Sequence, residues 1–295
     1  MSTINISGFT SNSGANFKEF ISEKLDSILD FDKEKFTSTY IKLWDVGEDT
    51  SMTFRGTGLA YKFQGKEVVG ITSGMLTSFN VIAEGAKVLD ITGLSLTGRV
   101  LTKAIDSGST SKFLNALLAG DDVIKATKYA DVFWGGDGKD RLYGGNGNDN
   151  ISGGNGNDRL YGQNGNDTLK GDAGNDRLEG GAGADKLYGG AGADTFVFRS
   201  KTDSTTSAPD KIYDFSRAEK DKIDLSAFDA NTLKAGDQDF AFIGTQKFHK
   251  IAGELRYQKS GGDTLVYGDI DGNGKADFKI VLDTLVDLQK GDFIL

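Results

Sequence analysis

Apolar residues recur at every ninth position through the middle of the chain, separated by stretches rich in glycine, asparagine and aspartate. Each one is the centre of three residues, which are long enough for a short strand with one side chain turned inward. The six residues between are glycine-rich, which favours a turn over a helix. The pattern predicts strand–turn units, two to a coil, stacked into a parallel β-roll. The recurring residues are Leu142, Ile151, Leu160, Leu169, Leu178, Leu187 and Phe196.

The repeated unit is a nine-residue phrase that occurs seven times without a gap over residues 135–197, and we number its positions as places one to nine. Glycine holds places one and four in every copy, and the apolar residue holds place eight. A flexible glycine-rich linker would not keep such a register. Place six is always aspartate, in Asp140, Asp149, Asp158, Asp167, Asp176, Asp185 and Asp194.

The invariant aspartates predict a metal. Carboxylates and backbone carbonyls between stacked turns are hard oxygen ligands, of which Ca²⁺ takes six to eight, whereas Mg²⁺ requires a tighter octahedron. Without a cation the place-six carboxylates would repel one another along the roll, and the thin interior could not offset this. We therefore expect the roll to fold only as it binds calcium.

Residues 1–116 contain no repeat, and we expect a separate α/β (α+β) domain there, of unknown target. Helical spacing of apolar residues predicts a helix over 17–29. Alternation over 53–73 around a turn at 64–66 predicts a hairpin. We expect further strands at 78–82 and at 88–96, the latter interrupted at Gly93, and short helices at 97–105 and 111–118.

Two imperfect phrases extend the predicted roll back to residue 117. They keep Asp122 and Asp131 at place six and Ile124 and Phe133 at place eight, but they lose the glycine pattern. Terminal repeats of a solenoid are usually atypical, so we expect capping turns without a complete metal site. After the roll, which spans 117–197, the short apolar runs of residues 198–295 predict a β-rich cap.

The composition excludes several function classes. A formal net charge of −9 and a pI near 4.8 argue against nucleic acid as a partner. The absence of cysteine excludes disulfides and thiolate zinc sites. No apolar run approaches the roughly 20 residues of a membrane helix. The first residues have neither the basic nor the apolar region of a secretory signal peptide.

The phrase G-G-x-G-x-D-x-U-x, with U apolar, resembles the calcium-binding repeat of RTX (repeats-in-toxin) proteins. The segments GADTFVF, APDKIYDF, DKIDLS and GDIDGNGKADFKIVL are similar to the C-terminal domain of serralysin-type metalloproteases. This resemblance covers residues 117–295 and implies a roll whose cap carries an export signal. It does not reach the protease domain, which needs H-E-x-x-H and a further histidine, because the chain has one histidine, His249.

The resemblance also implies a ligand set: the carbonyls of places two and four and the carboxylate of place six, with each ion bridging one turn and the next but one. About five to seven calcium ions would then bind. At place two, Gln163 and Asp172 depart from the family's glycine. Carried over, the ligands are Gly136, Gly138, Asp140, Gly145, Gly147, Asp149, Gly154, Gly156, Asp158, Gln163, Gly165, Asp167, Asp172, Gly174, Asp176, Gly181, Gly183, Asp185, Gly190, Gly192 and Asp194.

Two features outside the repeats have alternative interpretations. Residues Asp269–Asp277 resemble the front of an EF-hand loop, but Ile280 stands where a bidentate glutamate would close the site, and a structural hairpin is the alternative. The end of the chain, Asp292–Leu295, resembles the uncleaved signal read by type I secretion machinery. Its alternative is the packed end of a strand.

Aromatic residues at place nine, where side chains point outward, suggest a surface. Tyr143 and Tyr161 fall two phrases apart and should be neighbours on one sheet, with Trp134 and Tyr188 well separated on the other. The pair could stack on sugar rings, although exposed tyrosine is common on strands.

Together these features predict a secreted, extracellular, non-enzymatic calcium-binding protein that folds after type I export and acts at a cell surface or in an extracellular matrix. Its expected partners are the type I secretion machinery, through the C-terminus, and an extracellular polysaccharide or cell-surface ligand. H-E-x-x-H, G-x-S-x-G and a nucleophilic cysteine are absent. The alternative is an extracellular enzyme that acts on polysaccharide or another polymer through residues 1–116.

Overall fold

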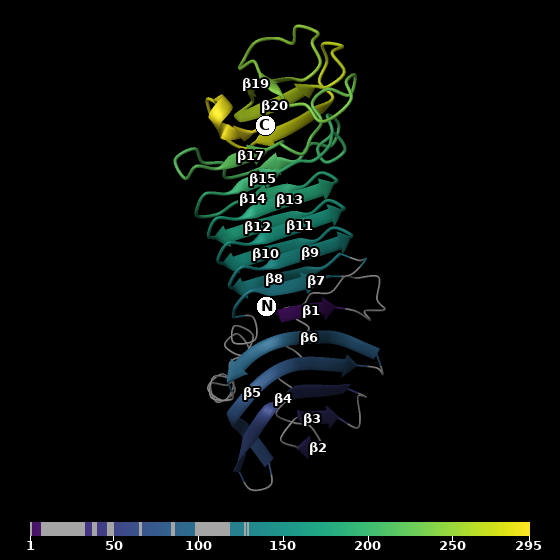
Figure 1. The fold of residues 1–295 in the computed structure, drawn as a ribbon, viewed down its shortest axis with the longest axis vertical. Coiled ribbons are helices and arrows are strands. Elements are labelled where there is room, and N and C mark those ends of the chain that lie inside the picture. The colour runs from purple at the N-terminus through teal and green to yellow at the C-terminus, as the bar shows by residue number, and fades with distance from the viewer. Residues whose placement is uncertain are drawn as a thin grey trace.

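In the computed structural model the chain forms one elongated stack of β-strands (Figure 1). The roll occupies the middle of the stack, the cap with the C-terminus lies above it, and the remaining strands lie below it. Before residue 119, only the backbone of the strands is described. The structure describes residues 2–6, 33–36, 40–45, 50–64, 67–83, 86–97, 119–126, 128 and 130–295.

The roll consists of two sheets, to which successive phrases contribute strands alternately. Sheet A takes β7 (Asp122–Lys125), β9 (Arg141–Asn146), β11 (Arg159–Asn164), β13 (Arg177–Ala182) and β15 (Thr195–Val197). Sheet B takes β8 (Val132–Asp137), β10 (Asn150–Asn155), β12 (Thr168–Ala173) and β14 (Lys186–Tyr188). The predicted parallel β-roll is confirmed.

Each strand pairs in parallel with the strand two phrases later, so that equal places lie side by side. Leu160, for example, is paired with Leu142 on one side and Leu178 on the other. One coil therefore contains 18 residues, which is the separation between hydrogen-bonded residues of successive coils. This register follows from the sequence because every ninth residue is equivalent.

The interior of the roll is narrow and is filled by three places of each phrase. In the phrase that begins at Gly153, that glycine, Asp158 and Leu160 are buried, while the other places are partly or fully exposed. The place-eight side chains from Leu142 to Phe196 have no exposed surface. Each strand thus contributes one apolar side chain to the core between the sheets, and the place-six aspartates lie beside these side chains.

The strands are longer than the three residues that the pattern predicts. They continue through places one to three of the next phrase, as in Arg141–Asn146. Glycine is a poor strand former, but in this roll its neighbours above and below have the same conformation. The ladder therefore continues through a bend: Gly154 pairs with both Gly136 and Asp172.

In the described part of the chain, six strands precede the roll: β1 (Ser2–Ile6), β2 (Lys33–Phe36), β3 (Tyr40–Asp45), β4 (Thr50–Gln64), β5 (Glu67–Ala83) and β6 (Ala86–Thr97). The hairpin predicted around 64–66 is confirmed, because β4 and β5 pair antiparallel. The strands predicted at 78–82 and 88–96 lie within β5 and β6. Their pairing shifts register between Leu76 and Ser78, opposite the segment that contains Gly93.

These strands join the roll through β1, which pairs antiparallel with β6 and parallel with β7. Sheet A is therefore continuous from β2 to β22 and contains 13 strands among the described residues. The helix predicted at 17–29 and the one at 111–118 lie outside the described residues, as does all but Thr97 of the helix predicted at 97–105. The boundary at residue 116 also stays a prediction.

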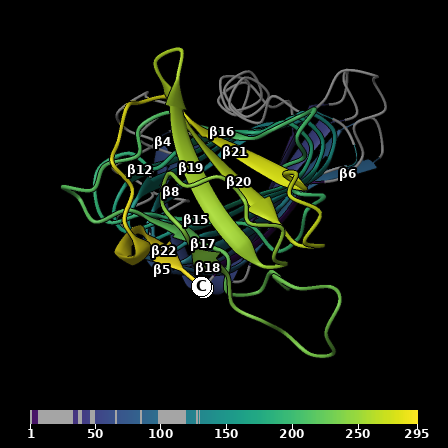
Figure 2. The ribbon, with the colours of Figure 1, turned by 90° about the horizontal axis from the view of Figure 1, so that it is seen from above.

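The cap extends both sheets. Sheet A gains β17 (Lys222–Asp224) and, after a 3₁₀ turn at Lys290–Asp292, β22 (Phe293–Ile294). Sheet B gains β16 (Lys211–Ile212), β21 (Phe278–Leu282), β20 (Asp263–Asp269), β19 (Glu254–Ser260) and β18 (Ala241–Phe242). Seen from the C-terminal end, β19, β20 and β21 cross over the coils below (Figure 2).

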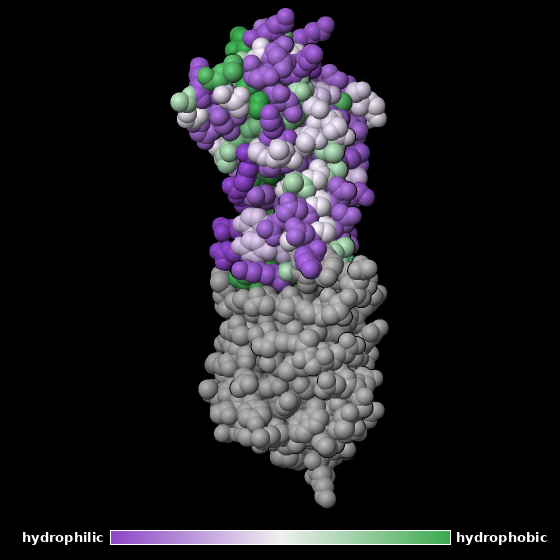
Figure 3. Space-filling view, turned by 90° about the vertical axis from the view of Figure 1, so that its right-hand side faces the viewer, coloured by the Kyte–Doolittle hydropathy of each residue, from purple (hydrophilic) through white to green (hydrophobic). Residues whose placement is uncertain are grey.

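The cap has a broader apolar core than the roll. Phe228, Phe240 and Phe278 form a cluster of three buried rings with centroids 4.8–5.6 Å apart. Figure 3 shows hydrophobic residues gathered at the cap, above a flank of the roll that is largely hydrophilic. Among the described residues, no helix is long and apolar enough to cross a membrane.

The place-nine aromatic residues lie as predicted. The rings of Tyr143 and Tyr161 stack on sheet A, with centroids 4.8 Å apart and planes 6° from parallel. On sheet B, β10 and β12 separate Trp134 from Tyr188. Tyr188 stacks instead on Tyr213 from the cap, with centroids 4.6 Å apart.

Candidate calcium-binding ladder

The place-six aspartates form a hydrogen-bonded ladder along each edge of the roll. From Asp140 to Asp176, the backbone N–H of each donates to Oδ1 of the aspartate 18 residues later, as from Asp140 to Asp158 (2.8 Å) and from Asp158 to Asp176 (2.7 Å). On the other edge, Asp149 donates to Asp167 and Asp167 to Asp185, both at 2.7 Å. One oxygen of each carboxylate is thus fixed by the neighbouring coil.

The second oxygen, Oδ2, is buried and has no hydrogen-bond partner in any of the seven aspartates from Asp140 to Asp194. Their side chains are only 1–2% exposed. A buried carboxylate oxygen without a partner is costly, because an ion taken out of water must be compensated by a cation or neutralised by a proton. The ladder thus contains a row of buried carboxylate oxygens that a bound cation would compensate.

Desolvation accordingly raises the pKa of these carboxyls. Burial is the largest cause, opposed by the hydrogen bond from the preceding coil and, in most of them, reinforced by neighbouring carboxylates. The pKa rises from 3.8 to about 7 for Asp140, Asp149, Asp176 and Asp185. It rises to about 6 for Asp158, Asp167 and Asp194.

Carbonyl oxygens approach the same positions. A Cβ placed on Gly135 would overlap both Oδ2 of Asp140 and the carbonyl oxygen of Gly153. The same holds at Gly144, where Asp149 and the carbonyl oxygen of Gly162 would be met. Place one must therefore be glycine, since a side chain would fill the space on which a carboxylate and a carbonyl converge.

Places two and four adopt the left-handed backbone conformation in every turn of the array. Their carbonyl oxygens lie against the same place of the next coil: a Cβ on Gly154 would meet the carbonyl of Gly136, and one on Gly156 that of Gly138. The residues with positive φ are Gly136, Gly138, Gly145, Gly147, Gly154, Gly156, Gln163, Gly165, Asp172, Gly174, Gly181, Gly183, Gly190 and Gly192.

This donor set fits calcium. It combines carboxylate and carbonyl oxygens from two stacked turns, with no nitrogen or sulfur, and Ca²⁺ prefers oxygen-only coordination of this kind. The sequence-predicted ligand residues are brought together in consecutive turns. Their individual assignment to ions, and the number of ions, stay predictions.

Two turns depart from glycine at place two without losing the conformation. Gln163 has φ +77° and Asp172 has φ +72°, both in the region that non-glycine residues avoid. The Asp172 carboxylate accepts a hydrogen bond from the Ser152 hydroxyl on the neighbouring strand. The predicted ligand at place two is a backbone carbonyl. Replacing glycine by glutamine or aspartate therefore leaves this ligand in place.

The first turns of the roll are more regular than their sequence indicates. Asp122 and Asp131 are 1% exposed, and their N–H groups donate to Asp140 and Asp149 at 2.7 Å. Gly120 keeps place four, with φ +111°. Among the described residues, the ladder therefore begins at Asp122.

The ladder also continues into the cap, through residues that the sequence pattern missed. Asp210 Oδ1 accepts the N–H of Asp185, and Asp221 Oδ1 accepts that of Asp194, both at 2.9 Å. Asp210 is fully buried, its Oδ2 has no partner, and burial and the neighbouring Asp185 raise its pKa well above 3.8. The spacings are 25 and 27 residues and not the 18 residues of one coil, so a search at the spacing of one coil does not find them.

A third cap residue closes the last turn. The two carboxylate oxygens of Asp214 accept the N–H groups of Gly189 and Gly190 at 2.9 and 3.0 Å. In the segment DKIYDF, the first aspartate thus continues the ladder and the second fixes the first two places of the last phrase.

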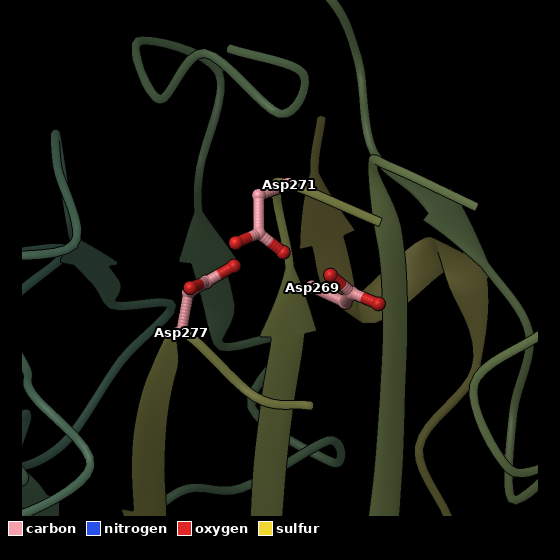
Figure 4. A group of neighbouring side chains, drawn as sticks. All are labelled: Asp269, Asp271 and Asp277. Atoms are coloured by element: carbon pink, nitrogen blue, oxygen red, sulfur yellow. The ribbon is translucent and has the colours of Figure 1, made fainter. Parts of the chain in front are cut away.

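The EF-hand-like segment lies in the loop between β20 and β21. Carboxylate oxygens of Asp269, Asp271 and Asp277 come within 4.8 Å of one another (Figure 4). Backbone N–H groups already occupy several of them: Asp269 accepts from Gly272 and Gly274. Within the described residues these contacts account for the shape of the loop, in agreement with the structural alternative.

Comparison with known protein families shows which family has this arrangement. Residues 124–295, more than half of the chain, match the family described as peptidase M10 serralysin C terminal. The chain belongs to this family. The resemblance inferred from the repeats and from the cap segments is confirmed, and the roll is an RTX-type calcium-binding domain. No curated protein matches the chain.

Solved structures with similarity to this family member include two subunits of a mannuronan C5-epimerase from Azotobacter vinelandii. The AlgE6R3 subunit is 27% identical over 56% of this chain and 71% of its own, with a TM-score of 0.25. The AlgE6R2 subunit is 27% identical over 57% and 92%, with a TM-score of 0.34. An extracellular lipase from Serratia marcescens is 17% identical over 60% and 38%, with a TM-score of 0.30.

Proposed function

We propose that this chain is an exported protein whose roll folds as it takes up extracellular calcium. The observation that carries the proposal is the row of seven buried Oδ2 atoms without partners. Calcium between the turns would join carboxylates and carbonyls of successive coils, so its binding free energy becomes folding free energy.

Membership of the serralysin C-terminal family supports export, because domains of this family and RTX-like domains are typical of secreted extracellular proteins. The export signal is proposed to lie in Asp292–Leu295. In the folded chain Phe293 is 7% exposed and its ring lies 5.2 Å from that of Phe242. Secretion machinery would therefore read this segment before the cap folds, and low cytosolic calcium would keep the roll open until then.

The roll explains how the chain folds, but it does not identify the molecule that the protein binds. We propose that residues 1–116 supply the specificity and that the protein acts without catalysis at a cell surface or in an extracellular matrix. Among the described titratable residues, His249 binds Glu254, with 2.6 Å between Nδ1 and Oε1, in the cap. The backbone N–H of His249 also donates to Oε2 of Glu254, so the pair fixes a loop.

Calcium titration of the full chain tests the proposal. Metal is removed with chelator and desalting, and far-ultraviolet circular dichroism is recorded as Ca²⁺ or Mg²⁺ is added, with bound calcium counted by equilibrium dialysis. We expect Ca²⁺ in the millimolar range to restore the β-sheet spectrum cooperatively and Mg²⁺ to have little effect. A roll that keeps its β-sheet spectrum at pH 8 after exhaustive chelation would disprove the coupling.

A further inference from the structure

Three asparagines in the roll are followed directly by glycine. They stand at place three of consecutive phrases, at the ends of β9, β10 and β11, and all three side chains are exposed: Asn146, Asn155 and Asn164. The fold does not require asparagine at this place, because alanine holds it in the last three phrases, at Ala173, Ala182 and Ala191. We call the three pairs the Asn–Gly sites.

An Asn–Gly pair is chemically reactive in an unfolded chain, because glycine has no Cβ to shield its own backbone nitrogen. This nitrogen gives up its proton and attacks Cγ of the asparagine side chain. A bond forms between them, and Nδ2 leaves as ammonia with that proton. Water then opens the succinimide ring. Opening at Cγ gives aspartate, and opening at the main-chain carbonyl gives isoaspartate, whose backbone runs through Cγ and is one carbon longer.

The folded roll holds the two reacting groups of such a site apart. The N–H of Gly156 donates to the carbonyl oxygen of Ala173 in the next coil at 2.7 Å. Nδ2 of Asn155 donates to Asp137 in the preceding coil at 2.8 Å. The nitrogen and the side-chain amide are therefore drawn in opposite directions along the roll. Both bonds must break before the nitrogen can reach Cγ, and this requires local opening of the coil.

The same restraint acts at Asn164 and is weaker at Asn146. Gly165 donates to the carbonyl oxygen of Ala182 in the next coil at 2.9 Å, and Nδ2 of Asn164 donates to Asn146 in the preceding coil at 2.9 Å. Asn146 is the acceptor of that bond, and Gly147 donates to the carbonyl oxygen of Asn164 at 3.0 Å. Both groups of this site are thus directed to the same coil.

We propose that the Asn–Gly sites are modification sites at which the metal-free chain deamidates to isoaspartate, and that calcium suppresses the reaction by folding the roll. The reaction consumes only water and needs no enzyme. Suppression by calcium rests on the proposed function, because calcium assembles the coils in which the glycine N–H groups are bonded. Within the calcium-loaded chain, Asn146 is the first of the three to react.

Isoaspartate at place three breaks the ladder of the roll. Asn155 is paired in register with Asp137 on one side and Ala173 on the other, and Gly156 follows it with φ +132°. An additional backbone carbon between these places shifts the place-four carbonyl, a predicted calcium ligand, out of line with its neighbours. A chain that stays without calcium therefore gradually loses its ability to fold.

Timed incubation of the full chain at pH 8 tests the proposal, with chelator, Ca²⁺ or Mg²⁺ in parallel samples. Tryptic peptides are analysed by fragment mass spectrometry, which locates each exchange of an amide for a carboxylate. Labelling with an isoaspartate-specific methyltransferase identifies the product. Asn150, which is followed by isoleucine, is the internal reference. The flanking trypsin sites are Arg141, Arg159 and Lys170.

We expect modification of all three sites in chelator and in Mg²⁺. In Ca²⁺ the reaction at Asn155 and Asn164 should be at least about tenfold slower, because it then requires local opening, and Asn146 should react faster than either. Asn150 should stay unmodified in every sample. Equal rates at Asn155 with and without calcium, or an equally fast reaction at Asn150, would overturn the proposal.

A variant with Asn146→Ala, Asn155→Ala and Asn164→Ala combined tests the consequence for folding, and alanine is the matched residue because it already stands at place three. After long metal-free incubation the variant should recover its β-sheet circular dichroism on addition of Ca²⁺, whereas the unsubstituted chain recovers a fraction that falls with incubation time. Equal recovery would refute the loss of folding. If the fresh variant does not fold, the site-resolved rates of the unsubstituted chain decide.

Circular dichroism of the fresh, unsubstituted chain separates the two proposals. A normal calcium transition with equal deamidation rates in chelator and Ca²⁺ refutes only the modification sites. A missing calcium transition refutes calcium-coupled folding.

Discussion

Protons should partly replace calcium in the roll, because the ladder carboxylates are buried with one oxygen unsatisfied. In the metal-free fold the pKa of seven aspartates is raised from 3.8 to about 6 or 7. A carboxyl whose pKa is higher in the folded state adds stability below its unfolded pKa and loses it as pH rises through the folded value. The metal-free roll should therefore be least stable above about pH 7 and gain stability as the solution is acidified.

The size of the effect decides whether it can be seen. One unit of raised pKa corresponds to about 1.4 kcal/mol, so seven ionised aspartates cost the folded state on the order of 20 kcal/mol at pH 8. This exceeds the roughly 5–15 kcal/mol that stabilises a typical domain. Acidification to pH 5.5 returns only on the order of 5–10 kcal/mol, because the same carboxyls are still ionised in the unfolded chain and the full effect is reached only below their unfolded pKa of 3.8.

The assay is far-ultraviolet circular dichroism of desalted, metal-free chain between pH 8 and pH 5.5, with sedimentation to exclude aggregation near the pI of 4.8. We expect β-sheet signal to increase on acidification without calcium. Asp158→Asn, which keeps an Oδ1 acceptor but removes one charge, should gain this signal at a higher pH and respond more weakly to calcium. A metal-free spectrum that does not change with pH would refute the reasoning.

Three further predictions concern single positions. Asp158→Ala should raise the calcium midpoint of folding several-fold, because it removes a ligand and an acceptor in a central coil, whereas Asp122→Ala at the first coil should barely move it; equal shifts would mean that the first turn holds a complete site. Deleting Asp292–Leu295, or placing charges at Phe293, should leave the protein inside the producing cell, and immunoblots of medium and cell fractions would show normal export if the signal lies elsewhere. Gln163→Gly should stabilise the loaded roll by about 1 kcal/mol, since a left-handed residue is strained unless it is glycine, with Gln163→Ala as the variant that gives no gain in thermal melting.

The roll was predictable from sequence because its contacts repeat with the period of the sequence. A repeat of nine residues places Leu160 between Leu142 and Leu178, and the same argument made neighbours of Tyr143 and Tyr161. No long-range pairing had to be guessed, since every contact within the array is with an equivalent residue one coil away.

Features outside the period were not accessible in this way. Asp210 and Asp221 join the ladder after loops that lengthen the spacing to 25 and 27 residues, so only the fold reveals their role. The pairing of β1 with β7 connects residues more than a hundred positions apart, and nothing in the local pattern of β1 specifies that partner. Strand length was underestimated because local propensity ignores the support of identical coils above and below.

The hydrogen bonds of the aspartate ladder have a direction, and this gives the roll a preferred order of assembly. Every buried place-six N–H donates to a carboxylate that is synthesised later, and the last donors, Asp185 and Asp194, are received by Asp210 and Asp221 of the cap. The exposed place-five ladder runs the opposite way, as from Asn166 to Asn148, but water can substitute for its bonds. A coil on a growing chain therefore lacks its buried acceptor, and we expect the roll to be wound from the cap towards the N-terminus.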